Sequence, residues 1–426
     1  MSLERIEKML KQFNAIGYSE GGMNRLAFTE NELKAKELFK EMCKEKGLNV
    51  RMDNSGNIIA RREGINPELP PVSTGSHLDT VINGGKYDGT VGVVAALELI
   101  CRLNTRHIQT LHPVEIICFT AEESSRFGLS TIGSKFMTGN LNKDEIENIK
   151  DKDDISMVEA FSQVGLHFDQ VESAFRRNEN IKAFFEVHIE QGPVLEQENV
   201  NIGVVTGIAA PTRLKVTVEG EASHSGATPM NLRKDAFLGA AEIGLAVENA
   251  ANLEALKGTV ATVGDCVITP GVMNVIPAKA EMKIDIRGID IGSKRVVYER
   301  VMATIKSIER ERHLLIHTEL LSDEEPVLLE EDIISSISQT CKQLGISYKK
   351  MPSGAGHDAM NMARLCSTGL IFIPCRDGLS HHKDEFTSIR SIKLGCDVLE
   401  KEVLKWAEPV NEKVSANNGG ESDERL

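Results

Sequence analysis

The sequence lacks several features that mark particular classes of protein. Its eight cysteines are scattered singly, without a CxxC pair or dense spacing, which is typical of reduced, cytosolic thiols rather than of a disulfide framework. It has no excess of positive charge. The formal net charge of −14 and the pI near 5.4 would repel phosphate backbones and anionic lipid headgroups, so we expect neither nucleic acid nor membrane partners.

The chain also begins without a long hydrophobic run. Residues 1–17, MSLERIEKMLKQFNAIG, alternate charged and apolar side chains at helical spacing. A signal peptide or a membrane span requires a continuous apolar stretch, so the segment predicts an amphipathic first helix instead. We therefore expect a cytoplasmic protein.

Length and pattern predict two domains. A chain of 426 residues with 41% hydrophobic residues is too long for one ordinary hydrophobic core. We expect an α/β catalytic domain built from residues 1–211 and 323–407, interrupted by an inserted α+β domain over residues 212–322, in which alternating strands form a sheet covered by helices on one side. Residues 408–426 hold few apolar groups to offset the cost of ordering and predict a disordered tail.

The order of elements in the first domain predicts where a ligand would bind. Residues 71–77 and 114–123 are strand-like, and residues 90–104 between them have helical periodicity with small residues on one side. A strand, helix, strand order indicates a parallel or mixed sheet, whose ligand site lies at the carboxyl ends of the strands. Residues 183–192 form another such strand, whereas the charged, helical pattern of residues 143–161 predicts a solvated face.

Side chains that can bind metal lie where these strands end. His77 and Asp79 lie at the end of the first strand, and the adjacent pair Glu122 and Glu123 lies at the end of the second. Taken singly, such a histidine is usually structural and such a glutamate pair usually lies on the surface, but several at successive ends of one layer favour a shared site. Two first-row metal ions that share one carboxylate need roughly five protein ligands. The chain supplies further candidates, namely Asp88, His188 and the His381 and His382 pair.

Seven motifs along residues 20–405 carry a resemblance to one family. They are GSHLDTVINGGKYDG, FTAEESSRFG, EVHIEQGPVLE, GEASHSGATPM, NVIPAKAEMKIDIR, SGAGHDA and GLSHHKDEF. In this order they resemble the amidase/hydantoinase/carbamoylase branch of the M20 metallopeptidase family, including a histidine at position 188 where aminopeptidase-like relatives usually carry a carboxylate. The resemblance implies an α/β, di-metal, aminopeptidase-like catalytic domain with an inserted α+β, ferredoxin-like domain for closure and dimerisation.

The same resemblance implies ligands for two divalent metal ions, zinc or manganese, with cobalt and nickel as the alternatives. One carboxylate would bridge both ions, and each ion would take two further side chains: Asp88 as the bridge, His77 and His188 at one ion, and Glu123 and His381 at the other. The last motif of the family reads SHxxxE. With Glu385 as its glutamate the ligand falls on His381, although His382 is adjacent.

Catalytic roles also follow from the resemblance. Glu122 would be the general base that takes a proton from the attacking water and returns it to the leaving nitrogen. Asp79 would accept the free N–H of His77 and so fix the tautomer of that ring. His224, in the inserted domain, would reach across a homodimer and stabilise the oxyanion of the tetrahedral intermediate, the alternative being a histidine in a surface loop.

The remaining candidates concern the substrate. Arg287 would form a bidentate pair with a substrate carboxylate, the alternative being a salt bridge on the domain surface. Gln191 and Asn274 would orient the neighbouring polar atoms. His357 and the backbone at Gly354 would face the same cleft, where amide groups are available for an anion.

These roles predict an amidohydrolase that cleaves the ureido (N-carbamoyl) group of a small acid and releases ammonia and carbon dioxide. SGAGHDA is more similar to members that hydrolyse allantoate than to carbamoylases, so we expect allantoate, with N-carbamoyl-L-amino acids or 3-ureidopropionate as alternatives. An M20 dipeptidase or aminoacylase is a further alternative, against which the histidine at 188 and the NVIP motif argue. An inactive metal-binding scaffold would be expected to lose Glu122 or Asp88, and both are present.

Overall fold

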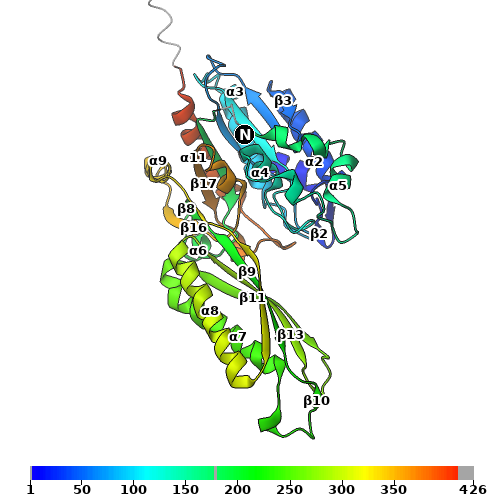
Figure 1. The fold of residues 1–426 in the computed structure, drawn as a ribbon. Helices are drawn as coiled ribbons and strands as arrows, with labels where there is room; N and C mark the ends of the chain where they lie inside the picture. Colours follow the sequence, from blue (N-terminus) through cyan, green and yellow to red (C-terminus); the bar gives the residue numbers. More distant parts are fainter. Residues whose placement is uncertain (1, 177–179, 411–426) are drawn as a thin grey trace, which may run out of the picture. The chain divides into compact units, whose positions relative to one another are not determined.

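The computed structural model describes residues 2–176 and 180–410 (Figure 1). The described residues divide into two compact units, the first made of residues 2–176, 180–206, 329–351 and 357–410 and the second of residues 207–328 and 352–356. The predicted insertion, 212–322, falls inside the second unit. Segment 352–356, which the sequence prediction assigned to the catalytic domain, belongs to the second unit instead, because the backbone N–H of Ala209 donates to the Ser353 carbonyl and Arg287 reaches the Gly354 carbonyl.

The first unit is built on a mixed sheet with helices around it. Its strands are β1 (Tyr18–Ser19), β2 (Gly22–Met23), β3 (Asn49–Met52), β4 (Ile58–Arg62), β5 (Val72–His77), β6 (Val114–Phe119), β7 (Ala183–Ile189), β8 (Ile202–Ile208), β16 (Tyr348–Ser353) and β17 (Ser367–Ile373). Its helices are α1 (Ser2–Asn14), α2 (Glu30–Glu45), α3 (Thr90–Thr105), α4 (Ile132–Thr138), α5 (Met157–Gln163), α6 (Val194–Gln197), α9 (Glu331–Leu344), α10 (Asp358–Met362) and α11 (Ile389–Ala407).

The strand order in this sheet is β8-β17-β7-β5-β6-β4-β3, with β16 beside β8. The four central strands, β17, β7, β5 and β6, are parallel to one another, so their carboxyl ends lie at one edge. Strands β5, β6 and β7 are buried along their whole length, as expected for parallel strands covered on both faces. The predicted β-α-β order of a mixed α/β layer is therefore confirmed.

Small residues let α3 pack closely on this sheet. A Cβ atom added at Gly92 would come within 2.5 Å of the Ser76 Cβ and of the Val187 carbonyl oxygen. Atoms do not approach so closely, so a side chain at this position would push α3 away from β5 and β7. Because α3 begins at Thr90, directly after the GSHLDTVINGGKYDG motif, its close packing also holds that motif against the strand ends.

The continuous helix predicted over residues 143–161 is wrong, although most of its charged side chains are exposed to solvent as predicted. A short 3-10 turn covers Lys143–Glu145, and α5 begins only at Met157. Between them the Asp151 carboxylate accepts hydrogen bonds from the backbone N–H groups of Asp153 and Ile155, which holds a turn. The apolar side chains of the segment are buried in a hydrophobic cluster with Phe28 and Phe136, and they include Ile146, Met157, Ala160 and Phe161.

The second unit has the predicted α+β arrangement. Its main strands, β9 (Ala210–Glu219), β11 (Val260–Thr269), β13 (Lys279–Gly288) and β14 (Leu315–Asp323), form an antiparallel sheet in the order β11-β13-β9-β14. Helices α7 (Ala236–Glu254) and α8 (Ile291–Arg312) lie side by side on one face of it (Figure 1). Residues alternate between buried and partly exposed along β9 and β13, so the other face of the sheet is polar.

Smaller strands complete the second unit. They are β10 (Ser223–His224), which pairs with β12 (Val275–Ile276), and β15 (Val327–Leu328), which pairs with residues 207–208. The sequence analysis did not predict β14. Most of its residues are exposed, because it lies at the edge of the sheet. No helix in the described ranges is long and apolar enough to cross a membrane.

The predicted tail, 408–426, begins too early. The backbone N–H of Leu111 donates to the Glu408 carbonyl, that of Val410 donates to the Gln109 carbonyl, and Lys182 Nζ lies 2.7 Å from the Glu408 carboxylate. Residues 408–410 are therefore held against residues 109–111. Residues 411–426 lie outside the described residues.

Candidate metal centre

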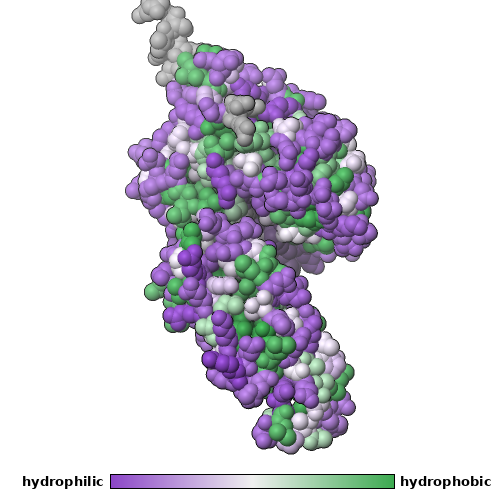
Figure 2. Space-filling model, in the orientation of Figure 1, coloured by the Kyte–Doolittle hydropathy of each residue, from purple (hydrophilic) through white to green (hydrophobic). Residues whose placement is uncertain are grey.

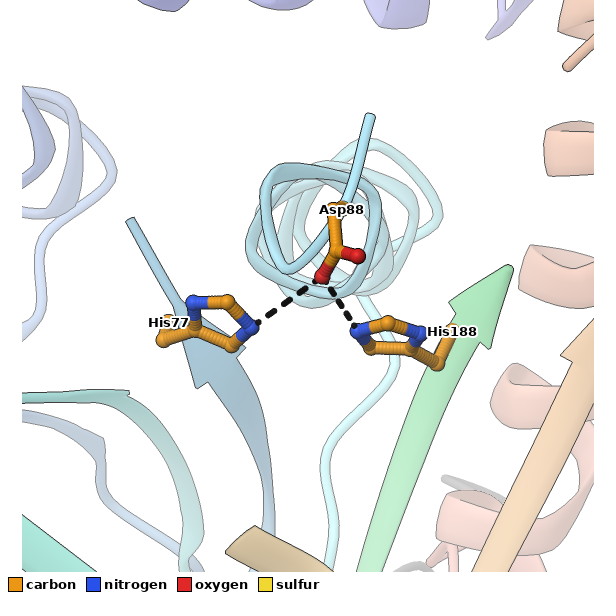
Figure 3. Close-up of side chains that lie close together, drawn as sticks. All are labelled: His77, Asp88 and His188. Carbon is orange, nitrogen blue, oxygen red and sulfur yellow. Dashed lines mark ion pairs between the residues drawn. The ribbon is translucent and has the colours of Figure 1, made fainter. Parts of the chain in front are cut away.

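Three buried side chains meet where the parallel strands end. His77 is the last residue of β5, His188 lies next to the end of β7, and Asp88 lies between them in the loop before α3 (Figure 3). The Oδ1 atom of Asp88 is 3.1 Å from His188 Nε2 and 3.5 Å from His77 Nε2. These three side chains could hold one metal ion together.

Both imidazole rings are oriented by hydrogen bonds on their far side. The Nδ1 atom of His77 is 3.0 Å from the Asp79 carbonyl oxygen, and that of His188 is 2.9 Å from the Ile189 carbonyl oxygen. A carbonyl oxygen only accepts, so each Nδ1 carries the proton and each Nε2 offers a lone pair. Two such lone pairs beside one carboxylate are the donors that a divalent first-row metal prefers.

A second group forms on the other oxygen of Asp88. His381 Nε2 lies 3.5 Å from Asp88 Oδ2 and 3.2 Å from Glu123 Oε1, and these three side chains could also hold an ion. The hydrogen bond with Glu123 raises the pKa of His381 to about 9 against the opposing effect of burial. The neighbouring His382 instead accepts from the backbone N–H of Asp384, so the structure brings His381 and not His382 to this group.

Negative charge is concentrated around these ligands. Glu122 is buried, with Oε2 3.7 Å from His77 Nε2. Burial raises the pKa of Glu122 well above its usual value; the His77 imidazole opposes this shift, whereas Glu123 and Asp358 add to it. Several carboxylates close together in a buried place repel one another unless protons or cations compensate them. The residues present therefore fit a cationic group.

Asp79 has a different contact from the one predicted. Its carboxylate accepts hydrogen bonds from the backbone N–H groups of Glu122, at 3.2 Å, and Glu123, at 2.9 Å. His77 Nδ1 lies closer to the Asp79 carbonyl oxygen, 3.0 Å, than to its carboxylate, 3.6 Å. The chain turns directly after β5, so the carbonyl faces the ring while the carboxylate orients the glutamate pair.

Gln191 contacts Asp88, the carboxylate that both candidate ligand groups share. Its Nε2 atom donates to Asp88 Oδ2 at 2.7 Å, and Gln191 has a positive φ of 58° in the loop after β7. Ser380, which the sequence analysis did not select, donates to the same Asp88 oxygen at 2.6 Å. Because both groups donate to Asp88, they hold its carboxylate in one orientation.

Glu385 is a second residue that the sequence analysis missed as a functional group. Its Oε1 atom accepts hydrogen bonds from the backbone N–H groups of Tyr87, at 2.8 Å, and Asp88, at 2.9 Å. A Cβ atom at Gly85 would come within 2.1 Å of the Glu385 carboxyl carbon, which explains the glycine in this loop. The SHxxxE motif could have indicated Glu385, because its glutamate follows the candidate ligand His381 in the same short motif.

His357 is buried behind this centre. Its ring lies 4.5 Å from that of His188 in an edge contact, and it also contacts Phe372. Burial lowers the pKa of His357 well below its usual value, and the nearby His188 lowers it further. Glu186, His188 and His357 could together hold a cation, although Glu186 already accepts from the Ser76 hydroxyl and from the Ala359 N–H.

The other substrate candidates lie in the second unit. His224 is exposed, and its Nδ1 atom accepts from the backbone N–H groups of Gly226 and Ala227, which leaves Nε2 at the outer edge of the ring. Asn274 lies beside it, because its carbonyl accepts from the Ser225 N–H. Arg287 donates to the Asp285 carboxylate and, at 3.3 Å, to the carbonyl of Gly354.

Comparison with other sequences gives a consistent result. Residues 74–405 match the family described as Peptidase family M20/M25/M40. An N-carbamoyl-L-amino acid amidohydrolase from Geobacillus stearothermophilus is 39% identical over 95% of this chain and 98% of that protein. A ureidoglycolate hydrolase from Oryza sativa subsp. japonica is 39% identical over 88% and 79%, and an allantoate amidohydrolase from Escherichia coli (strain K12) is 35% identical over 93% and 96%.

Solved structures agree with these matches. An amidase of the hydantoinase/carbamoylase family from Burkholderia multivorans has a TM-score of 0.88 and 32% identity, covering 96% of this chain and 98% of that one. The aminopeptidase PepT from Bacillus cereus, only 13% identical, shares the fold with a TM-score of 0.66 over 95% of this chain and 99% of its own. The predicted aminopeptidase-like fold class is therefore confirmed.

Enzymes of the M20 family depend on metal ions, and this chain has side chains that could hold them. The chain belongs to peptidase family M20/M25/M40 and, within it, to the hydantoinase/carbamoylase family of amidohydrolases.

Proposed function

We propose that this protein cleaves the ureido group of a small carboxylic acid, with two divalent metal ions bound around Asp88, and releases ammonia and carbon dioxide. One observation carries the proposal. Asp88 faces His77 and His188 with one carboxylate oxygen and His381 with the other, so a single carboxylate joins two sets of donors. Such a set suits zinc, manganese, cobalt and nickel alike, and metal analysis of the purified protein would distinguish them.

The chain's own residues then have separate tasks. When bound, the ions would act as Lewis acids on the scissile carbonyl and on the attacking water. Glu122, adjacent to the ligand Glu123, would accept a proton from the water and return it to the leaving nitrogen. Asp79 would keep Glu122 in place through its backbone N–H, 3.2 Å from the Asp79 carboxylate. Arg287 would bind the substrate carboxylate, with Asn274 orienting the polar atoms beside it.

Two substrates are supported by specific observations. The SGAGHDA motif favours allantoate, which is our first candidate. The N-carbamoyl-L-amino acids are the second candidate. The relative from Geobacillus stearothermophilus that bears this activity in its name is 39% identical over 98% of its length, whereas the equally identical ureidoglycolate hydrolase from Oryza sativa is covered over 79% of its length.

We also propose that the active assembly is a homodimer in which each subunit donates His224 to the site of the other. The second unit exposes large apolar side chains along α7, where Leu245 is 61% and Leu253 65% exposed. On the other face of the sheet, Val260 of the edge strand β11 is 57% exposed. Figure 2 shows hydrophobic residues among hydrophilic ones on the surface of this unit. Exposed apolar side chains and an unpaired strand edge are both features of subunit interfaces.

We infer a reducing, cytoplasmic environment as well. All eight cysteines are free thiols, and most of them are buried. Burial raises the pKa of Cys43 well above its usual value and that of Cys118 to about 12, so these thiols stay protonated and unreactive.

A substrate panel tests the proposed reaction. Metal-reconstituted enzyme would be assayed for ammonia release from allantoate, ureidoglycolate, N-carbamoyl-L-methionine and 3-ureidopropionate, and for free amine from N-acetyl amino acids and dipeptides. We expect turnover of a ureido acid, at a kcat/KM at least about a hundredfold above that of any acyl or peptide substrate. Preferred cleavage of an N-acetyl substrate or a dipeptide would refute the proposal.

A further inference from the structure

Arg287 shares its carboxylate partner with a second arginine. Asp285 and Arg287 lie on the same face of β13, and Arg213 lies directly opposite Asp285 on β9. Asp285 Oδ1 accepts from Arg287 Nε at 2.8 Å. Asp285 Oδ2 accepts both from Arg287 Nη2 and from Arg213 Nε, each at 3.1 Å. One carboxylate thus holds two guanidinium groups.

The hydrogen bonds of Arg287 leave one part of its guanidinium for a ligand. A guanidinium has five N–H groups. Two are bound by Asp285 and one, on Nη1, by the Gly354 carbonyl, so two of the five remain among the described residues, one on each Nη nitrogen. Two donors at the end of the fork match the two oxygens of a carboxylate.

The charge of this group depends on Arg213. Burial raises the pKa of Asp285, but the hydrogen bonds and charges of Arg287 and Arg213 outweigh this and keep the pKa below its usual value, so Asp285 is ionised at neutral pH. The pair of Asp285 and Arg287 alone would be neutral. With Arg213 the group carries two positive charges and one negative, a net charge of +1.

The neighbouring positions on the sheet add no further charge. Val260 and Pro211 lie opposite Arg287, Thr262 lies opposite Asp285, and Ser322 lies opposite Arg213. The next cation on β9, Lys215, shares the Glu281 carboxylate with Lys279, at 3.1 Å and 3.2 Å, and within the described part of the chain it forms no ion pair with Asp285. Arg213 is therefore the cation that shares a carboxylate with Arg287 and sets the net charge of that group.

We propose that Arg213 and Asp285 are positioning residues for recognition of the substrate carboxylate. Asp285 orients the guanidinium of Arg287 so that its two remaining donors point together, and Arg213 supplies the positive charge that Asp285 would otherwise cancel. This inference rests on the proposed function, in which Arg287 binds the carboxylate of a ureido acid. It adds that the enzyme selects anionic substrates through a group of three charged residues rather than through one arginine.

Steady-state kinetics of R213Q, R213K and D285N tests the proposal. The substrates are the ureido acid that the wild-type enzyme turns over fastest and the primary amide of the same acid, which has no negative charge. For R213Q we expect KM for the acid to rise about fivefold, as for loss of one nearby charge in a partly exposed site, with kcat within about twofold of wild type. D285N removes a negative charge but also releases the guanidinium of Arg287, and we expect KM to rise because the lost orientation outweighs the gain in net positive charge. R213K should restore most of the affinity, and neither variant of Arg213 should alter kinetics with the amide.

Two control variants make the outcome specific. K215Q removes a cation from the same face of β9, two residues away, and should leave KM unchanged. R287Q should raise KM for the acid more than any other variant. If R287Q raises KM while R213Q does not, or if R213Q impairs the acid and the amide equally, this inference is overturned and the proposed function stands. If R287Q itself leaves KM unchanged, the carboxylate site of the proposed function is wrong, and this inference is overturned with it.

Discussion

Ser380 donates a hydrogen bond of 2.6 Å to the Oδ2 atom of Asp88, although 292 residues separate them in the chain. The same short loop carries Glu385, whose carboxylate accepts the backbone N–H of Asp88 at 2.9 Å. Two residues distant in sequence therefore orient Asp88, the proposed bridging ligand. Ser380 binds its side chain and Glu385 binds its backbone.

Substitution of Glu385 should weaken metal binding. In E385Q the Oε1 oxygen can still accept from the backbone N–H groups of Tyr87 and Asp88, but it loses its negative charge. The amide that replaces Oε2 cannot accept from the Ser380 hydroxyl, which lies 3.2 Å from Oε2, so Asp88 is less well oriented. We expect about tenfold weaker affinity for Mn²⁺ or Zn²⁺, measured by calorimetry on the apoenzyme, because residues that orient ligands have effects of this size. K383A, in the same exposed loop, is the matched control and should bind metal as the wild type does.

Substitution of Glu122 should separate metal binding from turnover. E122Q keeps the size of the side chain but loses the proton acceptor, so kcat should fall by several orders of magnitude while metal content stays the same. Metal analysis and ammonia release on one preparation give both values. E147Q, on the exposed surface, controls for loss of a carboxylate in general. Turnover near the wild-type value would show that Glu122 is not the base.

Removal of metal should lower both activity and stability. The buried carboxylates Asp88, Glu122 and Glu123 repel one another without cations, and a ligand that binds only the native state stabilises it by mass action. Dialysis against a chelator should abolish turnover and lower Tm by several degrees, as recorded by differential scanning calorimetry. Addition of Mn²⁺ or Zn²⁺ should restore both. Full activity in a preparation shown to be free of metal would contradict the proposed centre.

Mixed dimers test whether His224 acts across the interface. H224A and E122Q homodimers should each be nearly inactive. In a mixed dimer, the H224A subunit keeps Glu122 and receives His224 from its E122Q partner, so one complete site forms. Refolding or exchange of an equal mixture should regain roughly a quarter of wild-type activity, because half of the dimers are mixed and each has one complete site of two. No regain in a mixture with proven subunit exchange would show that His224 acts within its own chain.

The buried Glu98 should make stability depend on acid pH. It accepts from Ser2 at 2.6 Å, Arg5 at 2.9 Å and Arg102 at 2.9 Å. Burial raises the pKa of Glu98, but these hydrogen bonds outweigh it and the net pKa is lowered. A lowered pKa in the folded state means that the stabilisation is present above the unfolded-state pKa, about 4.3, and is lost as the pH falls through the folded-state value.

E98Q should therefore be less stable than the wild type at pH 7 by about 3 kcal/mol, the cost of breaking a buried charged network. The difference should shrink as the pH falls below about 4, where the wild-type carboxylate also becomes protonated. Urea unfolding at a series of pH values measures this, and E7Q, an exposed residue of α1 paired with Lys11, should show no such difference. A difference that is constant with pH would assign the effect to packing instead.

Much of the fold could be predicted because local patterns and tertiary environment agree in the central strands. β6 and β7 are mostly apolar, as expected for buried parallel strands, and β5 is a buried strand of small residues that ends at His77. Residues 143–161 were predicted wrongly because their charged side chains dominate the pattern. The few apolar ones, such as Ile146 and Phe161, are buried by contacts with Phe28 and Phe136, which are distant in sequence.

The sequence by itself determined which residue types stand at the strand ends, and hence the family and the candidate ligands His77, Asp88 and His188, because ligand chemistry depends on residue identity and short spacing. Only the tertiary structure decided which atoms meet. It turned His381 rather than His382 toward Glu123, assigned the Asp79 carboxylate to two backbone N–H groups, and set Arg213 opposite Asp285. Loop conformation and strand register, which depend on contacts between distant segments, determine each of these relationships.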